Sequence, residues 1–128
     1  MLEAARRHGV DIPTLCHDPR MDPLGACRLC RVKIEGQRRW TAACTLPARQ
    51  GLRVVTHDEE ITHYRRVLRE MVASGNPPGE CRRCREIDPC ELHRHIEAYG
   101  ASSGRFRGAT SGTFKEDPNP FILRDYSR

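Results

Sequence analysis

Seven cysteines carry most of the chemistry that this sequence can support, and they fall into two groups. The first group consists of Cys16, Cys27, Cys30 and Cys44, with ten, two and thirteen residues between successive members. Four thiolates can hold either one zinc ion or a [2Fe–2S] cluster. Structural zinc sites usually draw their ligands from two short C-x2–4-C pairs, whereas this group has one such pair and two separate cysteines. The spacing therefore favours an iron–sulfur cluster, and a structural zinc-binding interaction module is the alternative.

The second group begins with Cys81 and Cys84, which repeat the C-x2-C spacing, and Cys90 follows after five more residues. Three thiolates need a fourth ligand to complete a [4Fe–4S] site. The candidates for this ligand are His93, His95, Asp88 and a residue from outside the chain. The sequence thus predicts a second iron–sulfur site whose ligand set is left open.

Composition limits the kind of protein that can carry these sites. A chain of 128 residues with 38% apolar and 5% aromatic residues can build only a modest core. Small domains of this kind usually rely on metals or disulfides, and an odd number of cysteines fits a secreted disulfide framework poorly. The first residues do not resemble a signal peptide, and no stretch approaches the ~20 apolar residues of a membrane span. We therefore expect metal ligation in a reducing, cytoplasmic compartment, either free or on the cytoplasmic face of a membrane complex.

The net charge of +5 does not by itself indicate nucleic-acid binding. The arginines occur as scattered pairs such as Arg65–Arg66, and none is interleaved with aromatic residues on a strand. We expect these pairs to lie on solvated faces, to offset the negative charge of metal–thiolate clusters, or to meet an acidic partner.

Three helices and three strands are expected to position the cysteines. A turn-rich loop spans residues 16–30, and a hairpin with its turn at Gly36–Gln37 returns the chain to Cys44. The expected helices cover residues 2–9, 58–74 and 91–99, and the expected strands cover 31–35, 38–43 and 52–56. The apolar stripe of the long helix is predicted to be Ile61, Tyr64, Leu68, Met71 and Val72.

Several motifs along the chain belong together. Those in the first half are Leu2-Glu3-Ala4-Ala5, Asp11-Ile12-Pro13-Thr14-Leu15-Cys16, Gly25-Ala26-Cys27-Arg28-Leu29-Cys30, Val32-x-Ile34-Glu35-Gly36 and Ala42-Ala43-Cys44-Thr45. Those in the second half are Cys81-x2-Cys84-x5-Cys90-Glu91-Leu92, Tyr99-Gly100, Arg105-Phe106 and Asn119-Pro120-Phe121-Ile122-x-Arg124-Asp125. Together they resemble one region of a known protein family, the N-terminal part of the large iron–sulfur subunit of NADH dehydrogenase (respiratory complex I). The same region occurs in NAD-linked formate dehydrogenases and in multi-cluster iron hydrogenases.

The resemblance implies an α+β protein with two cluster-binding parts. Residues 1–57 would be a β-grasp [2Fe–2S] ferredoxin-like domain, and residues 58–100 a small helical [4Fe–4S] module. Residues 101–128 would be an irregular tail that leads towards an absent ferredoxin module. Two strands of the β-grasp sheet, its first hairpin, would also be missing, so the chain is expected to be truncated at both ends.

The resemblance also implies that Cys16, Cys27, Cys30 and Cys44 hold the [2Fe–2S] cluster. The family uses three cysteines and one histidine for [4Fe–4S], but the position of its histidine is Pro77 here. We therefore predict that His93 takes this place beside Cys81, Cys84 and Cys90.

Electron transfer is the predicted function. No G-x-G-x-x-G nucleotide fingerprint and no catalytic constellation is present, so the chain is not expected to be an enzyme alone. By resemblance it would serve an NADH, formate or hydrogen oxidoreductase, with other subunits or domains of a redox complex as partners. A non-functional gene fragment is a further alternative. Arg28 and Arg31, which lie beside the first cysteine group, are expected to raise the potential of its cluster.

Overall fold

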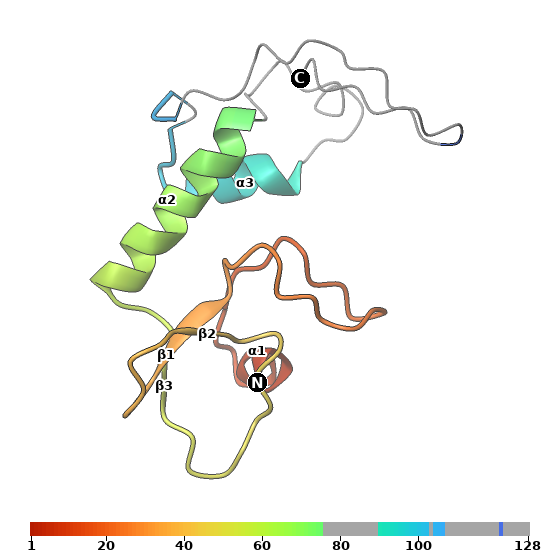
Figure 1. The fold of residues 1–128 in the computed structure, drawn as a ribbon, viewed down its shortest axis with the longest axis vertical. Helices are drawn as coiled ribbons and strands as arrows, with labels where there is room; N and C mark the ends of the chain where they lie inside the picture. Colours follow the sequence, from red (N-terminus) through yellow and green to blue (C-terminus); the bar gives the residue numbers. More distant parts are fainter. Residues whose placement is uncertain (76–89, 103, 107–120, 122–128) are drawn as a thin grey trace. The chain divides into compact units, whose positions relative to one another are not determined.

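A computed structural model describes residues 1–75, 90–102, 104–106 and 121. The chain divides into two compact units, Met1–Leu68 and Arg69–Arg128, and each is described by itself. The elements are α1 (Leu2–Arg7), β1 (Arg31–Ile34), β2 (Thr41–Ala42), β3 (Val54–Val55), α2 (Glu59–Gly75) and α3 (Glu91–Ala98) (Figure 1). In the described part of the chain, no helix is long and apolar enough to cross a membrane.

The first unit is built on a three-stranded antiparallel sheet with the order β2-β1-β3. β1 and β2 form the predicted hairpin, in which Arg31 faces Ala42 and Val32 faces Thr41. The return strand is shorter than predicted, since only Thr41–Ala42 keeps ladder geometry. The sheet and the helices make a small α+β unit, as predicted, and its arrangement is consistent with a [2Fe–2S] ferredoxin-like domain.

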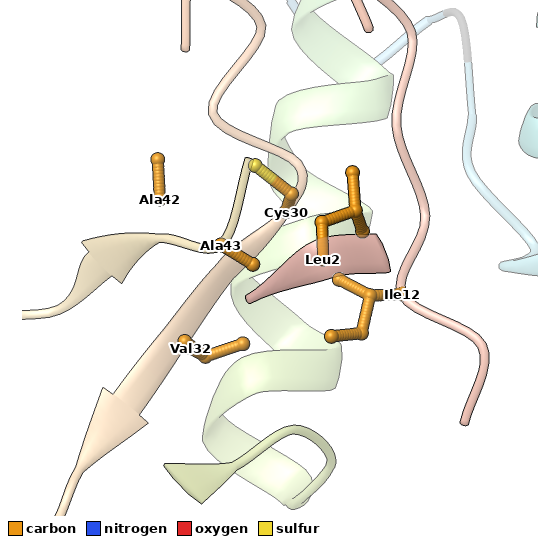
Figure 2. Packing of buried hydrophobic residues seen from close by; sticks show 6 residues of the cluster. All are labelled: Leu2, Ile12, Cys30, Val32, Ala42 and Ala43. Atoms are coloured by element: carbon orange, nitrogen blue, oxygen red, sulfur yellow. The ribbon is translucent and has the colours of Figure 1, made fainter. Parts of the chain in front are cut away.

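The core of this unit includes one of the candidate ligands. Alternation along β1 buries every second residue, and Cys30 continues that alternation one residue before the strand. The buried cluster contains Leu2, Ile12, Cys30, Val32, Ala42 and Ala43. Figure 2 shows the side chain of Ile12 directed towards Val32. The backbone N–H of Leu2 donates to the carbonyl oxygen of Ala43 at 3.1 Å, which ties α1 to the segment before Cys44.

The buried face of α2 differs from the predicted apolar stripe. Ile61 is buried as expected, but Met71 and Val72 are 54% and 39% exposed. Arg65 and Arg69 are instead fully buried. The prediction that Arg65 lies on a solvated face is therefore wrong. Its guanidinium is buried because backbone carbonyl groups accept its hydrogen bonds.

The second unit is held by a polar network between α2, α3 and the segment after α3. The guanidinium of Arg69 stacks on the ring of Tyr99, with 3.5 Å from its central carbon to the ring centroid. The carboxylate of Glu70, which is 1% exposed, accepts a 2.7 Å hydrogen bond from Arg105. Buried charged groups require such partners, so these contacts fix α3 against the end of α2.

Candidate metal centre

Two segments of the first unit bring the first cysteine group together. Cys16 follows an extended stretch that is buried at Ile12, Pro13 and Thr14, and its Sγ accepts a 3.3 Å hydrogen bond from the backbone N–H of Cys27. None of the five described cysteines forms a disulfide.

The β1–β2 hairpin explains how Cys30 and Cys44 meet across thirteen residues. The N–H of Ala43 donates to the carbonyl oxygen of Cys30 at 3.0 Å, which extends the hairpin pairing by one step beyond the ladder. The Sγ atoms of Cys30 and Cys44 are 3.5 Å apart. The prediction that a hairpin returns Cys44 to the site is confirmed.

The loop between Cys16 and Cys30 needs left-handed backbone at two positions. Gly25 has φ +62°, and a Cβ there would lie 3.2 Å from Cγ2 of Thr45 and 3.9 Å from Sγ of Cys44. Arg28 has φ +61° although it is not glycine, a conformation that costs roughly 1–3 kcal/mol. Such strain is found where surrounding structure fixes a functional loop, and here it lies between two cysteines of the group.

The thiols differ in their electrostatic surroundings. Burial by itself raises the pKa of Cys27, but hydrogen bonds with the backbone of Leu15 and Leu29 and with Cys16 outweigh it and lower the pKa below its ordinary value. Burial is also the main cause that raises the pKa of Cys44 to about 11, followed by its contact with Cys30 and repulsion from Cys30 and Cys16. Crowded thiolates repel one another, so cations must neutralise them if all four are to ionise together.

The described residues do not converge on a single ion. No group of three or more His, Cys, Asp or Glu side chains within them has the geometry to hold one metal ion. The cysteines are instead arranged in pairs: Sγ of Cys16 contacts the backbone N–H and the side chain of Cys27, and Sγ of Cys30 contacts Sγ of Cys44. A two-iron cluster takes two thiolates at each iron, so this arrangement and the all-sulfur donor set fit a [2Fe–2S] cluster better than a single zinc ion.

Comparison with protein-family models decides between these centres. Residues 1–59, which contain all four cysteines, match the family described as "2Fe-2S iron-sulfur cluster binding domain". The first 59 residues are thus similar to a [2Fe–2S] cluster-binding domain. The family recognised from the sequence and the predicted [2Fe–2S] cofactor are thereby confirmed, and the zinc alternative is not favoured.

Relatives of this [2Fe–2S] domain and the residues that follow it are parts of much larger redox proteins. One subunit of an NADH-quinone oxidoreductase of Rhizobium meliloti is 40% identical over 100% of this chain and 15% of its own length. The alpha subunit of the NADPH-Fe(3+) oxidoreductase of Geobacter sulfurreducens is 35% identical over 96% of this chain and 15% of its own length. The chain thus spans about 15% of the length of these curated relatives.

A solved structure agrees with the fold around the [2Fe–2S] domain. The crystal structure of an NAD+-reducing [NiFe]-hydrogenase in the H2-reduced state matches with a TM-score of 0.71 and 40% identity. The match covers 84% of this chain and 45% of that chain.

The second cysteine group is only partly described. Cys81 and Cys84 lie outside the described residues, while Cys90 is half-buried at the position before the first residue of α3. His93 is half-buried on the first turn of that helix. The ligand set proposed for [4Fe–4S] stays a prediction.

His95, on the same helix, contacts two protein groups. Nδ1 of His95 lies 3.3 Å from Nη2 of Arg69. Arginine has only donors, so this contact requires the lone pair of His95 to be on Nδ1 and its proton on Nε2. Nε2 lies 3.8 Å from a carboxylate oxygen of Glu91. Both ring nitrogens of His95 are therefore directed at protein groups.

Two residues beside the [2Fe–2S] site were not singled out from the sequence. His17 follows Cys16, its side chain is 8% exposed, and its Nε2 is 3.0 Å from a carboxylate oxygen of Glu3 on α1. Arg65 donates to the backbone on either side of Cys30. The only sequence signal for Arg65 is its place in the four-residue spacing Ile61, Arg65, Arg69 and Ala73, all of which are buried.

Proposed function

We propose that this chain transfers single electrons as a domain or subunit of an NADH dehydrogenase, formate dehydrogenase or hydrogenase type of oxidoreductase. The pairing of Cys16 with Cys27 and of Cys30 with Cys44 inside the [2Fe–2S] domain carries the proposal. When bound, a [2Fe–2S] cluster supplies a one-electron redox centre. The chain's own residues supply four thiolates, and the loop through Gly25 brings the backbone close to them.

The partners and the location follow from the relatives as proposals. Each curated relative described above is named as a subunit of a redox enzyme. We propose that this chain likewise works beside other subunits or domains that hold the electron donor and acceptor. A cytoplasmic location, with attachment to a membrane complex as an option, suits free thiols at a metal site.

The finer fold assignment is also proposed. Residues 1–57 form a β-grasp domain, and residues 58–100 bind a [4Fe–4S] cluster through Cys81, Cys84, Cys90 and His93. His93 lies three residues after Cys90, on the first turn of α3, and this place supports its choice as the fourth ligand.

Anaerobic purification of the full chain tests the primary proposal. We expect a coloured protein with iron and acid-labile sulfide in equal amounts, and an EPR signal of a [2Fe–2S] centre after reduction with dithionite. Cys44→Ser should remove that signal. A colourless protein with stoichiometric zinc and no sulfide would overturn the electron-transfer proposal.

A matched pair of histidine variants tests the second cluster. His93→Ala should abolish the [4Fe–4S] signal and leave the [2Fe–2S] signal intact, whereas His95→Ala should retain both. Retention of both signals in His93→Ala would remove His93 from the ligand set.

A further inference from the structure

Arg65 belongs to an arginine pair that was expected on a solvated face, and it is completely buried. Its Nε donates to the carbonyl oxygen of Leu29 at 3.0 Å, and its Nη2 donates to that of Arg31 at 3.2 Å. These carbonyl groups belong to the residues immediately before and after Cys30. One guanidinium thus spans the backbone of a cluster ligand, using the forked donor geometry that only arginine has.

The sheet explains why this position needs such a donor. β3 pairs with β1 only at Lys33 and Ile34, so the carbonyl of Arg31 lies beyond the end of that ladder. A buried carbonyl without a partner is costly. Arg65 therefore takes the place that a longer β3 would have filled.

Cys30 is held from the opposite direction by the hairpin. Its own carbonyl oxygen accepts the 3.0 Å hydrogen bond from Ala43, and its side chain is completely buried. Three successive carbonyls, at residues 29–31, are thus each anchored by a hydrogen bond. The direction of the Cys30 side chain is set by these anchors on both sides.

The guanidinium also brings a permanent positive charge beside the ligand. A [2Fe–2S] cluster with four thiolates carries a charge of about −2 when oxidised and gains one more negative charge on reduction. A nearby cation stabilises the reduced form more than the oxidised form, and burial of the cation weakens solvent screening. Both the hydrogen bonds and the positive charge of Arg65 therefore act on the redox site.

We propose that Arg65 is a positioning residue of the [2Fe–2S] centre that fixes the backbone around Cys30 and raises the reduction potential of the cluster. This inference rests on the proposed electron-transfer function. It assigns a redox role to a residue of α2 that is 35 positions away from the cysteine it positions.

The test uses the full chain with its cluster reconstituted anaerobically, and compares Arg65→Gln and Arg65→Lys with Arg66→Gln. Arg66 is the matched control because it is the next arginine on α2 and its side chain is exposed. Potentials are measured by mediated dithionite titration. Arg65→Gln should lower the equilibrium constant for reduction about tenfold, which corresponds to about 59 mV for one electron. Arg66→Gln should shift it less than about threefold.

Arg65→Lys separates geometry from charge. It retains the positive charge but cannot make the two-pronged contact, so we expect a potential near that of the parent, together with a changed EPR g-tensor and faster loss of iron to a chelator. A parent-like g-tensor and rate of iron loss in Arg65→Lys would refute the positioning role. A parent-like potential in Arg65→Gln would refute the electrostatic role.

A measurement on the cluster-free chain keeps the inference testable if Arg65→Gln loads no cluster. Alkylation of Cys30 by iodoacetamide, followed by peptide mass spectrometry, should be about tenfold faster in Arg65→Gln than in the parent and unchanged in Arg66→Gln. Equal rates in Arg65→Gln and the parent would overturn the inference. Failure of the proposed function would be seen separately, because the parent chain itself would then bind no iron and sulfide.

Discussion

Replacement of Gly25 by alanine should destabilise the protein through two separable effects. The first is backbone strain, because a left-handed φ costs an L-residue roughly 1–2 kcal/mol. The reduced freedom of the unfolded chain offsets about 0.4–1 kcal/mol of this cost. Gly36 has φ +78° and open space where its Cβ would lie, so Gly36→Ala carries the same backbone strain and the same offset but no steric contact. We expect Gly36→Ala to lower the free energy of unfolding by about 1 kcal/mol.

The second effect is a steric contact that only Gly25→Ala introduces. Its Cβ would lie 3.2 Å from Cγ2 of Thr45, inside the optimal carbon–carbon separation of about 3.5–4.0 Å. Thr45 cannot rotate without cost, because its hydroxyl donates to the carbonyl of Ala42 at 3.2 Å. Loss of such a hydrogen bond costs about 0.5–1.5 kcal/mol. We therefore expect Gly25→Ala to be about 1 kcal/mol more destabilising than Gly36→Ala.

Urea unfolding of the full chain, followed by circular dichroism, measures both variants, and loss of iron to a chelator reports on the cluster site. The decisive comparison repeats both glycine variants in a protein that carries Thr45→Ser. Serine keeps the hydroxyl group but lacks the methyl group that the new Cβ of Gly25→Ala would contact. In that background the excess cost of Gly25→Ala over Gly36→Ala should disappear. Equal destabilisation by the two alanine variants in the parent background would refute the close approach of Gly25 to the Cys44 segment.

Three further predictions concern backbone strain, pH and helix capping. Arg28→Gly should raise the free energy of unfolding by about 0.5–1 kcal/mol by relieving the left-handed φ, and an equal gain from Arg28→Ala would contradict this. The cluster-free chain should lose stability as pH rises from 9 towards 11, because the Cys44 thiol ionises at its ordinary pKa of 9.0 when unfolded but at about 11 when folded. The urea concentration at the unfolding midpoint measures this loss. An equal fall of the midpoint in Cys44→Ser would exclude Cys44 as its cause. Asp58→Ala should lower the melting temperature more than Glu60→Ala. Both carboxylates accept a hydrogen bond from Lys33, but Asp58 also accepts one of 2.7 Å from the backbone N–H of Ile61 at the start of α2. Equal decreases in the two variants would show that this helix cap contributes nothing.

The hairpin and the meeting of its two cysteines could be predicted because their signals are local. Alternating polarity over residues 31–35 and Gly36 in the turn indicate strand, turn and return. Cys30 and Cys44 lie at the two ends of this unit, so its closure brings them together whatever the rest of the chain does. The meeting of Cys30 and Cys44 could thus be predicted without any long-range information.

The burial of Arg65 could not be predicted because its cause is distant in the sequence. The prediction of an apolar stripe on α2 assumed that buried helix positions carry apolar side chains. Arg65 instead faces two carbonyl oxygens, those of Leu29 and Arg31. The carbonyl of Arg31 is available because β3 pairs with β1 only at Lys33 and Ile34 and does not continue to residue 57, which would face Arg31 in this register. No pattern within α2 contains that information.

The left-handed backbone at Arg28 also has no local signal. Glycine is the residue that normally marks such a position, and the sequence provides it at Gly25 but not three residues later. The conformation is imposed by a loop that must place Cys27 and Cys30 on either side of Arg28.

The burial of Cys30 within the core has a consequence for how this domain can evolve. Cys30 packs in the same cluster as Leu2, Ile12 and Val32, and Cys44 lies against that cluster. A lineage that abandoned the iron–sulfur centre would retain one unused thiol in the core and another packed against it, and most replacements of Cys30 would create a void or overfill the space. Redox function and folding are thus under joint selection at these positions, so drift can alter the exposed Arg20 or Met21 far more freely than either of these cysteines.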